Sequence, residues 1–466
     1  MNSQPQTNQE RFNKGKALRA QVPREKHSEL EGFKGRDPVA ILAQSDPFRV
    51  QSLVPVRYAR MLQSPFTFLR GAAAVMAADL SRAPMAGIPV QACGDCHLMN
   101  FGAFASPEDN ILFDINDFDE TLPGVDFTVD LKRLAASVAV AALAANLPAK
   151  RARSISKATV AVYRERIFAT HALSPLQIWH SRIDLEQELA AITDKNLRRK
   201  LALIIGKARG GLEEDDNFPH LVGGDHSRIA DKPPLIYHLE GGGADQNLDV
   251  PGVLAAYRET LAPDRRHVFD GYDLVDLTFK VVGVGSVGTF CAIGLFMSGD
   301  KNPLFLQIKE AQHSVLERIG RDLSYRGHQG QRVVEGQRAL QAASDIFLGW
   351  TKDETSGRQF YIRQLKNRRL GTVGALVEEQ ALADYATLCG RTLARAHARS
   401  GDAAMIAGYM GKGTAFDDAI AEFSMAYAAQ TQLDYAAIVA ARAAVPASGP
   451  TAKSKTRSAR TATANA

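Results

Sequence analysis

Residues 91–121 read QACGDCHLMNFGAFASPEDNILFDINDFDET. Apolar runs at residues 88–93 and 111–115 are separated by polar turn residues, so we expect two short strands around an acidic loop. Side chains with oxygen donors gather within 25 residues beside these runs: Asp95, Asn100, Asp114, Asp117 and Asp119. Carboxylate and amide oxygens are the ligands that Mg²⁺ prefers, usually together with substrate phosphates. The stretch therefore predicts a magnesium site, although Asp and Asn are also common in turns for structural reasons.

The spacing of these residues resembles the catalytic loops of the protein-kinase-like superfamily. Asp95 and Asn100 are five positions apart, as are the catalytic Asp and the metal-binding Asn of those enzymes, and an Asp-Phe pair begins at Asp117 after the next strand. The segment GDCHLMN is most similar to the G-D-x-H-x-x-N loop of aminoglycoside phosphotransferases. The resemblance implies that Asp95 is catalytic and that Asn100 and Asp117 hold Mg²⁺, with Asp119 as an additional candidate ligand.

A second motif lies almost 200 residues later, in VVGVGSVGTF, which contains Gly283, Gly285, Ser286 and Gly288. A G-x-G-x-x-G pattern alone fits a Rossmann turn, a kinase glycine loop or an ordinary hairpin. A Rossmann turn opens a helix, whereas the following TFCAIGLFM has the residues of a strand. A turn and another strand then lead to Lys309 in LFLQIKEA. Strand, glycine loop, strand, turn and strand with lysine is the layout of a kinase amino-terminal lobe, which binds ATP phosphates.

The lysine of such a lobe needs an acidic partner on the next helix. We expect a helix over residues 331–343 and favour Glu335 as this partner, with Glu317 as the nearer alternative. Two further strands are expected in IFLGWT and RQFYIRQLK. The segment FYIRQLK also resembles the strand that leads into the hinge where an adenine docks.

The glycine loop follows the catalytic loop here, whereas ordinary kinases have the reverse order. The sequence therefore predicts an α+β, bilobal, kinase-like fold that is circularly permuted, with a small antiparallel β lobe and a larger helical lobe. Permutation is physically admissible because termini are often exposed and close together. The expected segments are a polar arm (1–50), a first helical part with an irregular linker from 211 (51–265), the β lobe (270–375), a second helical part (376–445) and a disordered basic tail (446–466).

Composition limits the possible roles. Hydrophobic residues form 45% and charged residues 23% of the 466 residues, which is typical of a soluble globular protein with a large core. Four basic residues of the tail account for most of the net charge of +5 and leave the body at about +1, so a specific nucleic-acid role is disfavoured. Four cysteines, a polar start and no run of about 20 apolar residues favour a cytoplasmic protein outside the membrane.

Several residues near the motifs have competing interpretations. Cys93 and Cys96 form a C-x-x-C, but the further ligands of a zinc site are missing from the sequence pattern, so we disfavour a zinc or redox role. His397 is interpreted as a packed or capping histidine. Arg70 is either an ion-pair residue at the core edge or a phosphate contact. Asp130 is expected to cap a helix, whereas in phosphotransferases an Asp after the metal loop braces that loop.

Across residues 30–440 the chain also resembles a bacterial family known only as a domain of unknown function. The resemblance is carried by SPFTFLRGAA, CGDCHLMNFG, FDINDFDET, VVGVGSVGT, KEAQHSVLE, RVVEGQR, QAASDIFLGW and LARAHARSGDAAMIAGYMGK. It implies no activity. One departure from the phosphotransferase pattern is Cys93, which replaces the first histidine of the loop, whereas His97 matches the second.

The motifs together predict an ATP- and Mg²⁺-dependent phosphotransferase whose partners are a nucleotide and an unidentified acceptor. The resemblance to aminoglycoside phosphotransferases favours a small molecule as this acceptor. Two alternatives stay open. One is a kinase-like protein that binds a nucleotide or partner without catalysis, and the other is transfer of the nucleotidyl (AMP) group on the same fold. The sequence does not indicate an oligomeric state.

Overall fold

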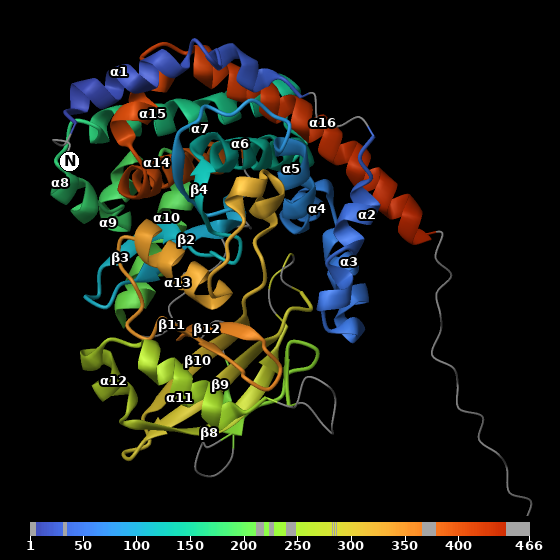
Figure 1. Ribbon diagram of the computed structural model, residues 1–466, viewed down its shortest axis with the longest axis vertical. Coiled ribbons are helices and arrows are strands. Elements are labelled where there is room, and N and C mark those ends of the chain that lie inside the picture. The colour runs from blue at the N-terminus through green and yellow to red at the C-terminus, as the bar shows by residue number, and fades with distance from the viewer. Residues whose placement is uncertain are drawn as a thin grey trace, which may run out of the picture.

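A helical part and a curved antiparallel sheet make up the molecule (Figure 1). The computed structural model describes residues 6–30, 35–210, 219–222, 228–238, 248–281, 283, 285, 287–365 and 379–443. The predicted tail and Ser286 lie outside these residues. Among the described helices, none combines the length and apolar character needed to cross a bilayer.

The sheet has six strands in the order β11-β12-β10-β9-β8-β7, all of them antiparallel to their neighbours. Its strands are β7 (Ile236–Tyr237), β8 (Tyr272–Lys280), β9 (Cys291–Ser298), β10 (Pro303–Glu310), β11 (Gly349–Lys352) and β12 (Gln359–Gln364). Lys301, with a φ of 62°, makes the turn from β9 to β10. The strands expected on both sides of the glycine loop, and the two expected after the helix, are therefore confirmed.

Three helices pack against this sheet: α11 (Val250–Thr260), α12 (Pro263–Phe269) and α13 (Gln329–Leu340). Tyr257 and Phe269 belong to the same apolar core as Phe279 and Phe296 of the sheet. The expected boundary of the first helical part at residue 265 is therefore wrong, because the apolar faces of α11 and α12 are buried against the sheet. The linker expected over 211–265 also contains helix α11 and the start of α12.

The helical part is built from sequence on both sides of the sheet. Before the sheet lie α1 (Asn8–Leu18), α2 (Pro38–Ala43), α3 (Val54–Met61), α4 (Pro65–Gly71), α5 (Ala73–Leu80), α6 (Phe127–Ala144), α7 (Ala149–Thr170), α8 (Pro175–His180), α9 (Leu185–Glu188) and α10 (Lys195–Gly210). After it come α14 (Glu379–Ser400), α15 (Ala403–Met410) and α16 (Ala415–Ala443). Helix α14 packs on α7, and α16 packs on α6 and α7, so the two halves share one core (Figure 1).

The polar arm is ordered over helix α1, which packs closely on α15. A Cβ built on Gly408 would lie only 2.0 Å from the main-chain oxygen of Phe12, so glycine is needed for this approach.

The acidic stretch contains four short strands rather than two. Strand β1 (Pro89–Ala92) pairs with β4 (Leu122–Asp126), and β2 (Phe101–Ala105) pairs with β3 (Ile111–Ile115). Both pairs are antiparallel. Because of this pairing, the loop after β1 and the loop after β3 lie next to each other.

Candidate functional site

The loop that carries Asp95 is fixed by helix α6. Asp130, in the first turn of α6, accepts hydrogen bonds from the main-chain N–H groups of Cys93 (2.8 Å) and Gly94 (3.0 Å). Its Oδ2 lies 3.2 Å from Nε2 of His397, and both side chains are buried. The expectation that Asp130 caps α6 is wrong, because Asp126 is the N-cap. Asp130 instead braces the loop through charge-assisted hydrogen bonds, which are about twice as strong as neutral ones.

The carboxylate of Asp95 is oriented by Arg133, one helical turn after Asp130. Arg133 donates from Nε to Asp95 Oδ1 at 2.7 Å, and its Nη2 lies 2.5 Å from the same oxygen. His97 Nε2 lies 3.6 Å from Asp95 Oδ2. Burial lowers the pKa of His97 to about 4, so this imidazole is neutral near pH 7. Asp95 therefore has a fixed orientation and its charge is matched by one arginine.

Asn100 and Asp117 lie on the two adjacent loops. The side-chain amide of Asn100 donates to the main-chain oxygen of Asp95 at 2.6 Å, and Asn116 N–H donates to the main-chain oxygen of Asn100 at 2.8 Å. Asp117 Oδ1 accepts from the N–H of Asp119 at 3.2 Å. A Cβ on Gly94 would lie 2.2 Å from the main-chain oxygen of Glu120, so glycine permits the two loops to touch.

Asp114 does not belong to this group. It is buried, forms an ion pair with Arg395 of α14 and accepts from the N–H of Ala342 at 2.9 Å. Its role is to join β3 to helix α14.

Lys309 lies near the end of β10 and reaches from the sheet to the loop between β3 and β4. We call this loop, residues 116–121, the acidic loop. Its Nζ lies 2.5 Å from Asp119 Oδ2, and Tyr361 donates its hydroxyl proton to Asp119 Oδ1 at 2.7 Å. Burial alone would lower the pKa of Lys309, but the neighbouring carboxylates of Asp119 and Asp117 raise it well above its usual value. Lys309 is therefore a charged, buried contact between the sheet and the acidic loop.

The expectation that Glu335 holds Lys309 is wrong in this structure. Val333 and Val334 face the core, which turns Glu335 to the exposed side of α13, where Gln331 donates to it at 2.6 Å. The alternative, Glu317, lies beside His313 Nδ1 at 3.2 Å instead. The partner of Lys309 is Asp119.

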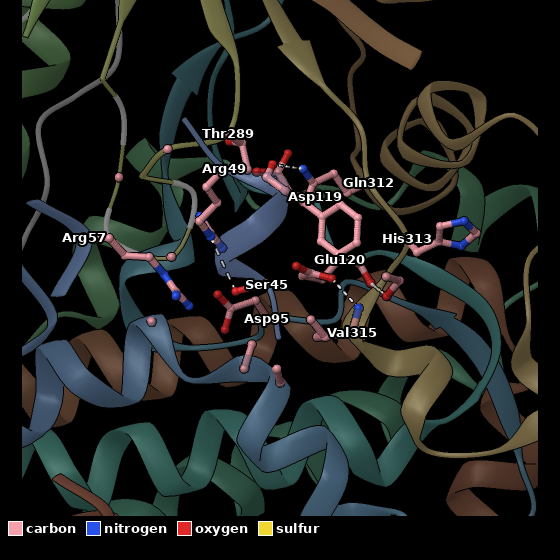
Figure 2. Close-up of a pocket in the computed structure, with 18 of the residues that line it drawn as sticks. Ser45, Arg49, Arg57, Asp95, Asp119, Glu120, Thr289, Gln312, His313 and Val315 are labelled. Carbon is pink, nitrogen blue, oxygen red and sulfur yellow. Dashed lines mark hydrogen bonds between the residues drawn. The ribbon is translucent and has the colours of Figure 1, made fainter. Parts of the chain in front are cut away.

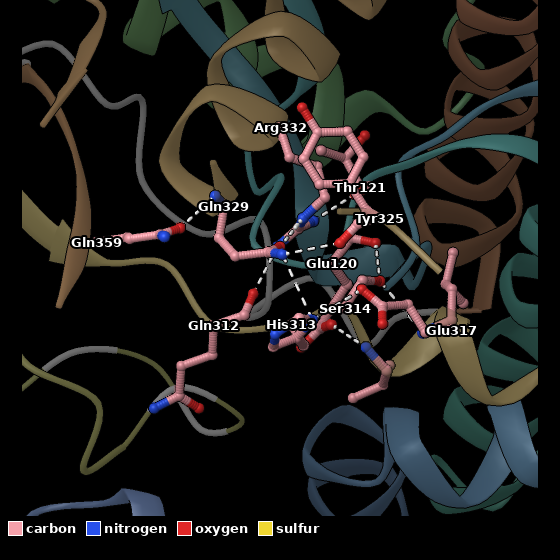
Figure 3. Close-up of polar contacts among 12 residues, drawn as sticks. Glu120, Thr121, Gln312, His313, Ser314, Glu317, Tyr325, Gln329, Arg332 and Gln359 are labelled. Carbon is pink, nitrogen blue, oxygen red and sulfur yellow. Dashed lines mark hydrogen bonds and ion pairs between the residues drawn. The ribbon is translucent and has the colours of Figure 1, made fainter. Parts of the chain in front are cut away.

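Helix α13 contributes an arginine to the site where a glutamate was expected. The Arg332 guanidinium is buried and donates to the main-chain oxygens of Asp119 (3.0 Å), Gln312 (2.7 Å) and Thr121. Figure 3 shows Arg332 beside Thr121, Gln312 and Gln329. It fixes the main chain of the acidic loop from the side of the sheet.

Glu120 also joins the acidic loop to the segment after β10. Its carboxylate accepts from the N–H of Val315 at 2.7 Å, and Ser314 donates its hydroxyl proton to the main-chain oxygen of Glu120 at 2.7 Å. Burial raises the pKa of Glu120 to about 7, although the hydrogen bond from Val315 and the charge of Arg332 lower it.

The glycine loop is held by the segment that precedes α4. Arg60 donates to the main-chain oxygen of Gly283 at 2.8 Å, Arg49 donates to that of Val287 at 2.5 Å, and Val50 N–H donates to that of Gly288 at 2.7 Å. Gly283 and Gly288 have φ values of 69° and 89°, a region that favours glycine. These contacts fix the loop to the segment before α4.

One cavity of about 860 Å³ lies between these elements (Figure 2). The predicted site residues that line it are Asp95, Asn100, Asp117, Asp119, Gly283, Gly285 and Gly288. Lys309 joins this group through its ion pair with Asp119. Arg70 also lines the cavity, whereas Glu335 does not. Thus motifs almost 200 residues apart in sequence meet in one place.

The two cysteines beside Asp95 lie in the core. Their sulfur atoms and a carboxylate oxygen of Asp130 lie within 4.8 Å of one another. However, Asp130 already accepts two main-chain hydrogen bonds. Burial raises the pKa of the Cys96 thiol to about 11 and the pKa of the Cys93 thiol well above its usual value. Thiols rather than thiolates are poor metal ligands, so the geometry favours a structural role. His397 is likewise packed, with its Nδ1 2.8 Å from the Tyr163 hydroxyl.

Sequence reasoning missed four arginines that hold the loops of the site: Arg133, Arg332, Arg49 and Arg60. Arg133 had a detectable signal, since it follows Asp130 by three positions and so shares its helix face. Arg332 and Arg49 had none, because their partners are distant main-chain oxygens.

Comparison with known protein families identifies a match over most of the chain. Residues 49–441 match the model of a family described as an uncharacterized protein conserved in bacteria (DUF2252). No curated protein and no solved structure matches the chain.

Proposed function

We propose that this chain, which belongs to the bacterial family DUF2252, is an ATP- and Mg²⁺-dependent phosphotransferase with a permuted kinase-like fold. One observation carries the proposal. Asp95, Asn100, Asp117 and the glycine loop line one cavity, and Lys309 contacts the same group through Asp119. Scattered motifs would instead have favoured a scaffold without catalysis.

The proposed roles follow the chemistry of each side chain. Asp95, oriented by Arg133, accepts the proton of the acceptor hydroxyl. The hydroxyl oxygen then bonds to the γ-phosphorus while the bond to the bridging oxygen breaks, and ADP leaves with the electron pair. The main chain of the glycine loop and Lys309 bind the nucleotide phosphates. Lys309 thereby exchanges part of its contact with Asp119 for phosphate.

The donor set fits magnesium. Asn100 donates its amide N–H to Asp95, which leaves its amide oxygen as a hard ligand, and Asp117 and Asp119 add carboxylates on the adjacent loop. When bound, Mg²⁺ supplies neutralisation of the charge on the transferred phosphoryl group. Asn100 and Asp117 would hold it, with Asp119 assisting when Lys309 moves to the nucleotide.

The test is transfer or hydrolysis of the γ-phosphate together with thermal stabilisation by Mg²⁺-ATP. We expect Asp117→Asn to lose both, with turnover falling about 10²–10³-fold because charge stabilisation is lost. Asp300→Asn, in the exposed turn after β9, is the matched control and should behave as wild type. Failure of millimolar Mg²⁺-ATP to stabilise the wild-type protein would contradict the proposal.

Nucleotidyl transfer would use the same groups, so the products must be identified. Mass spectrometry of the modified acceptor separates an added phosphate from an added AMP. The proposal requires the added phosphate. ATP binding without any modified acceptor or hydrolysis would favour a binding protein instead.

A further inference from the structure

The cavity is lined by both carboxylates and arginines. Among the carboxylates are those of Asp95, Asp117 and Asp119. Among the arginines are three from the segment before the proposed catalytic loop: Arg49, Arg57 and Arg70. Figure 2 shows Arg49 and Arg57 on one side of Asp95 and Glu120 on the other.

Arg70 is a cation without a hydrogen-bond acceptor in the described part of the chain. It lies at the end of α4, and its Nε is buried and unpartnered. Burial lowers the pKa of Arg70, and the carboxylate of Asp95 opposes that effect from beyond ion-pair distance. The guanidinium thus lines the cavity near the proposed catalytic residue with its hydrogen-bonding capacity unused.

Arg49 contacts neutral oxygens but no carboxylate at ion-pair distance among the described residues. Its guanidinium donates to the main-chain oxygen of Val287 at 2.5 Å and to Ser45 Oγ at 3.5 Å. Burial and the neighbouring charge of Arg57 lower the pKa of Arg49 to about 10. Arg57 differs, because it has an ion pair with Asp46 at 2.9 Å.

Both arginines lie against the glycine loop. A Cβ built on Gly288 would lie 3.1 Å from Cβ of Arg49, and one on Gly285 would lie 3.3 Å from the main-chain oxygen of Arg70. The glycine loop therefore contacts both residues, Asp95 lies near Arg70, and all of these groups line the same cavity. A ligand at these arginines would lie next to the phosphoryl group that the proposed reaction transfers.

Partly buried cations without a counter-ion are costly, and the cost is relieved when an anion binds. The planar fork of arginine matches phosphate and carboxylate oxygens. We infer that Arg49 and Arg70 form an anion subsite beside Asp95 and that the acceptor carries a phosphate or carboxylate group. The assignment to the acceptor rests on the proposed function.

Inorganic phosphate is the first probe. Calorimetric titration at up to roughly 10 mM phosphate should detect binding to the wild-type protein. Arg70→Gln and Arg49→Gln should each weaken it about tenfold or more, because a charge-assisted hydrogen bond is lost. Arg82→Gln, an exposed arginine outside the cavity, is the control and should bind normally. Arg70→Lys keeps the charge and should restore part of the affinity.

A second arm separates the acceptor from the nucleotide as the source of the anion. The titration is repeated with a saturating non-hydrolysable ATP analogue and Mg²⁺. Phosphate binding that persists supports an acceptor subsite, whereas competition assigns the arginines to the nucleotide phosphates and overturns the inference. A transfer assay should then favour a sugar phosphate or sugar acid over the neutral sugar, with the preference lost in Arg70→Gln.

The two ideas fail in different ways. Phosphate binding without any ATP binding would leave the anion subsite standing and remove the proposed function. ATP binding with no phosphate binding to folded wild-type protein, or with phosphate binding unchanged in both variants, would overturn the inference alone. Circular dichroism spectra of each variant confirm that it is folded.

Discussion

The two sides of the cavity are held in different ways. The proposed catalytic loop and the acidic loop are fixed by buried charged side chains, namely Asp130, Arg133, Lys309 and Arg332. The described residues of the glycine loop are fixed by less buried donors to their main-chain oxygens, such as Arg60 and Val50 N–H. Charge-assisted contacts set one geometry strongly in a low dielectric, whereas contacts nearer to water are weaker.

This difference matches the demands of phosphoryl transfer. The proposed base and metal ligands must be preorganised. The proposed phosphate cover must admit a nucleotide and release a product. Substitutions of the buried charged residues in and around the proposed catalytic loop should therefore have larger effects than substitutions of more exposed residues near them.

The largest effect is expected at Asp95. Asp95→Asn keeps the shape of the side chain but removes the proton acceptor, so turnover should fall about 10²–10⁴-fold. Stabilisation by Mg²⁺-ATP should persist, because the proposed metal ligands remain. Steady-state kinetics with thermal melts checks this. Unchanged turnover would remove Asp95 from the chemistry.

The next largest effect is expected at Asp130, which fixes the loop that carries Asp95. Asp130→Asn replaces one acceptor of the pair that binds Cys93 and Gly94 N–H groups, so the free energy of unfolding should fall by about 2–4 kcal/mol. Urea denaturation measures this. Asp402→Asn, at the N-cap of α15, is the matched control and should cost under about 1 kcal/mol, because Asn caps equally well. Equal losses would show that Asp130 has no special role.

A comparison of two variants in α13 tests whether Arg332, rather than Glu335, is the important residue of this helix. Arg332→Gln should lower the free energy of unfolding by about 2–3 kcal/mol, since three main-chain oxygens lose a charged donor. Glu335→Gln should change it by less than about 0.5 kcal/mol, because this side chain is exposed. The reverse order would restore Glu335 as the important residue of the helix.

The smallest effect is a pH dependence at Glu120. Its pKa in the folded protein is about 7, above the ordinary value of 4.5. The stabilisation from this group is therefore complete below pH 4.5 and is lost as the pH rises to about 7, by roughly 1–3 kcal/mol. Glu120→Gln cannot ionise and should flatten this part of the stability profile in urea titrations. An identical slope in the variant would exclude Glu120 as its cause.

Local patterns predicted much of this molecule. Alternation and turn residues were sufficient for the strands around the glycine loop and for the strands after α13. The spacing of Asp95, Asn100 and Asp117 was sufficient to predict that they lie together, and all three line one cavity.

Contacts between distant segments were not predictable in the same way. Asp119 and Glu335 are both acidic, so charge alone does not show which of them meets Lys309. Burial of Val333 and Val334 sets the rotation of α13 and turns Glu335 away, and Lys309 pairs with Asp119. The pairing of β1 with β4 depends likewise on partners that local propensity does not specify. Helices α11 and α12 were not predicted, because they lie in or next to a stretch rich in Gly, Pro and Asp. Their position depends on apolar packing against the sheet, which local sequence does not specify.

The most direct test is a crystal structure with Mn²⁺ and a non-hydrolysable ATP analogue, using the anomalous signal of manganese to locate the metal. The account predicts manganese bound by the oxygens of Asn100 and Asp117, with the nucleotide phosphates under the loop from Gly283 to Gly288 and beside Lys309. Manganese and nucleotide at a site away from Asp95 and Asp117 would contradict it.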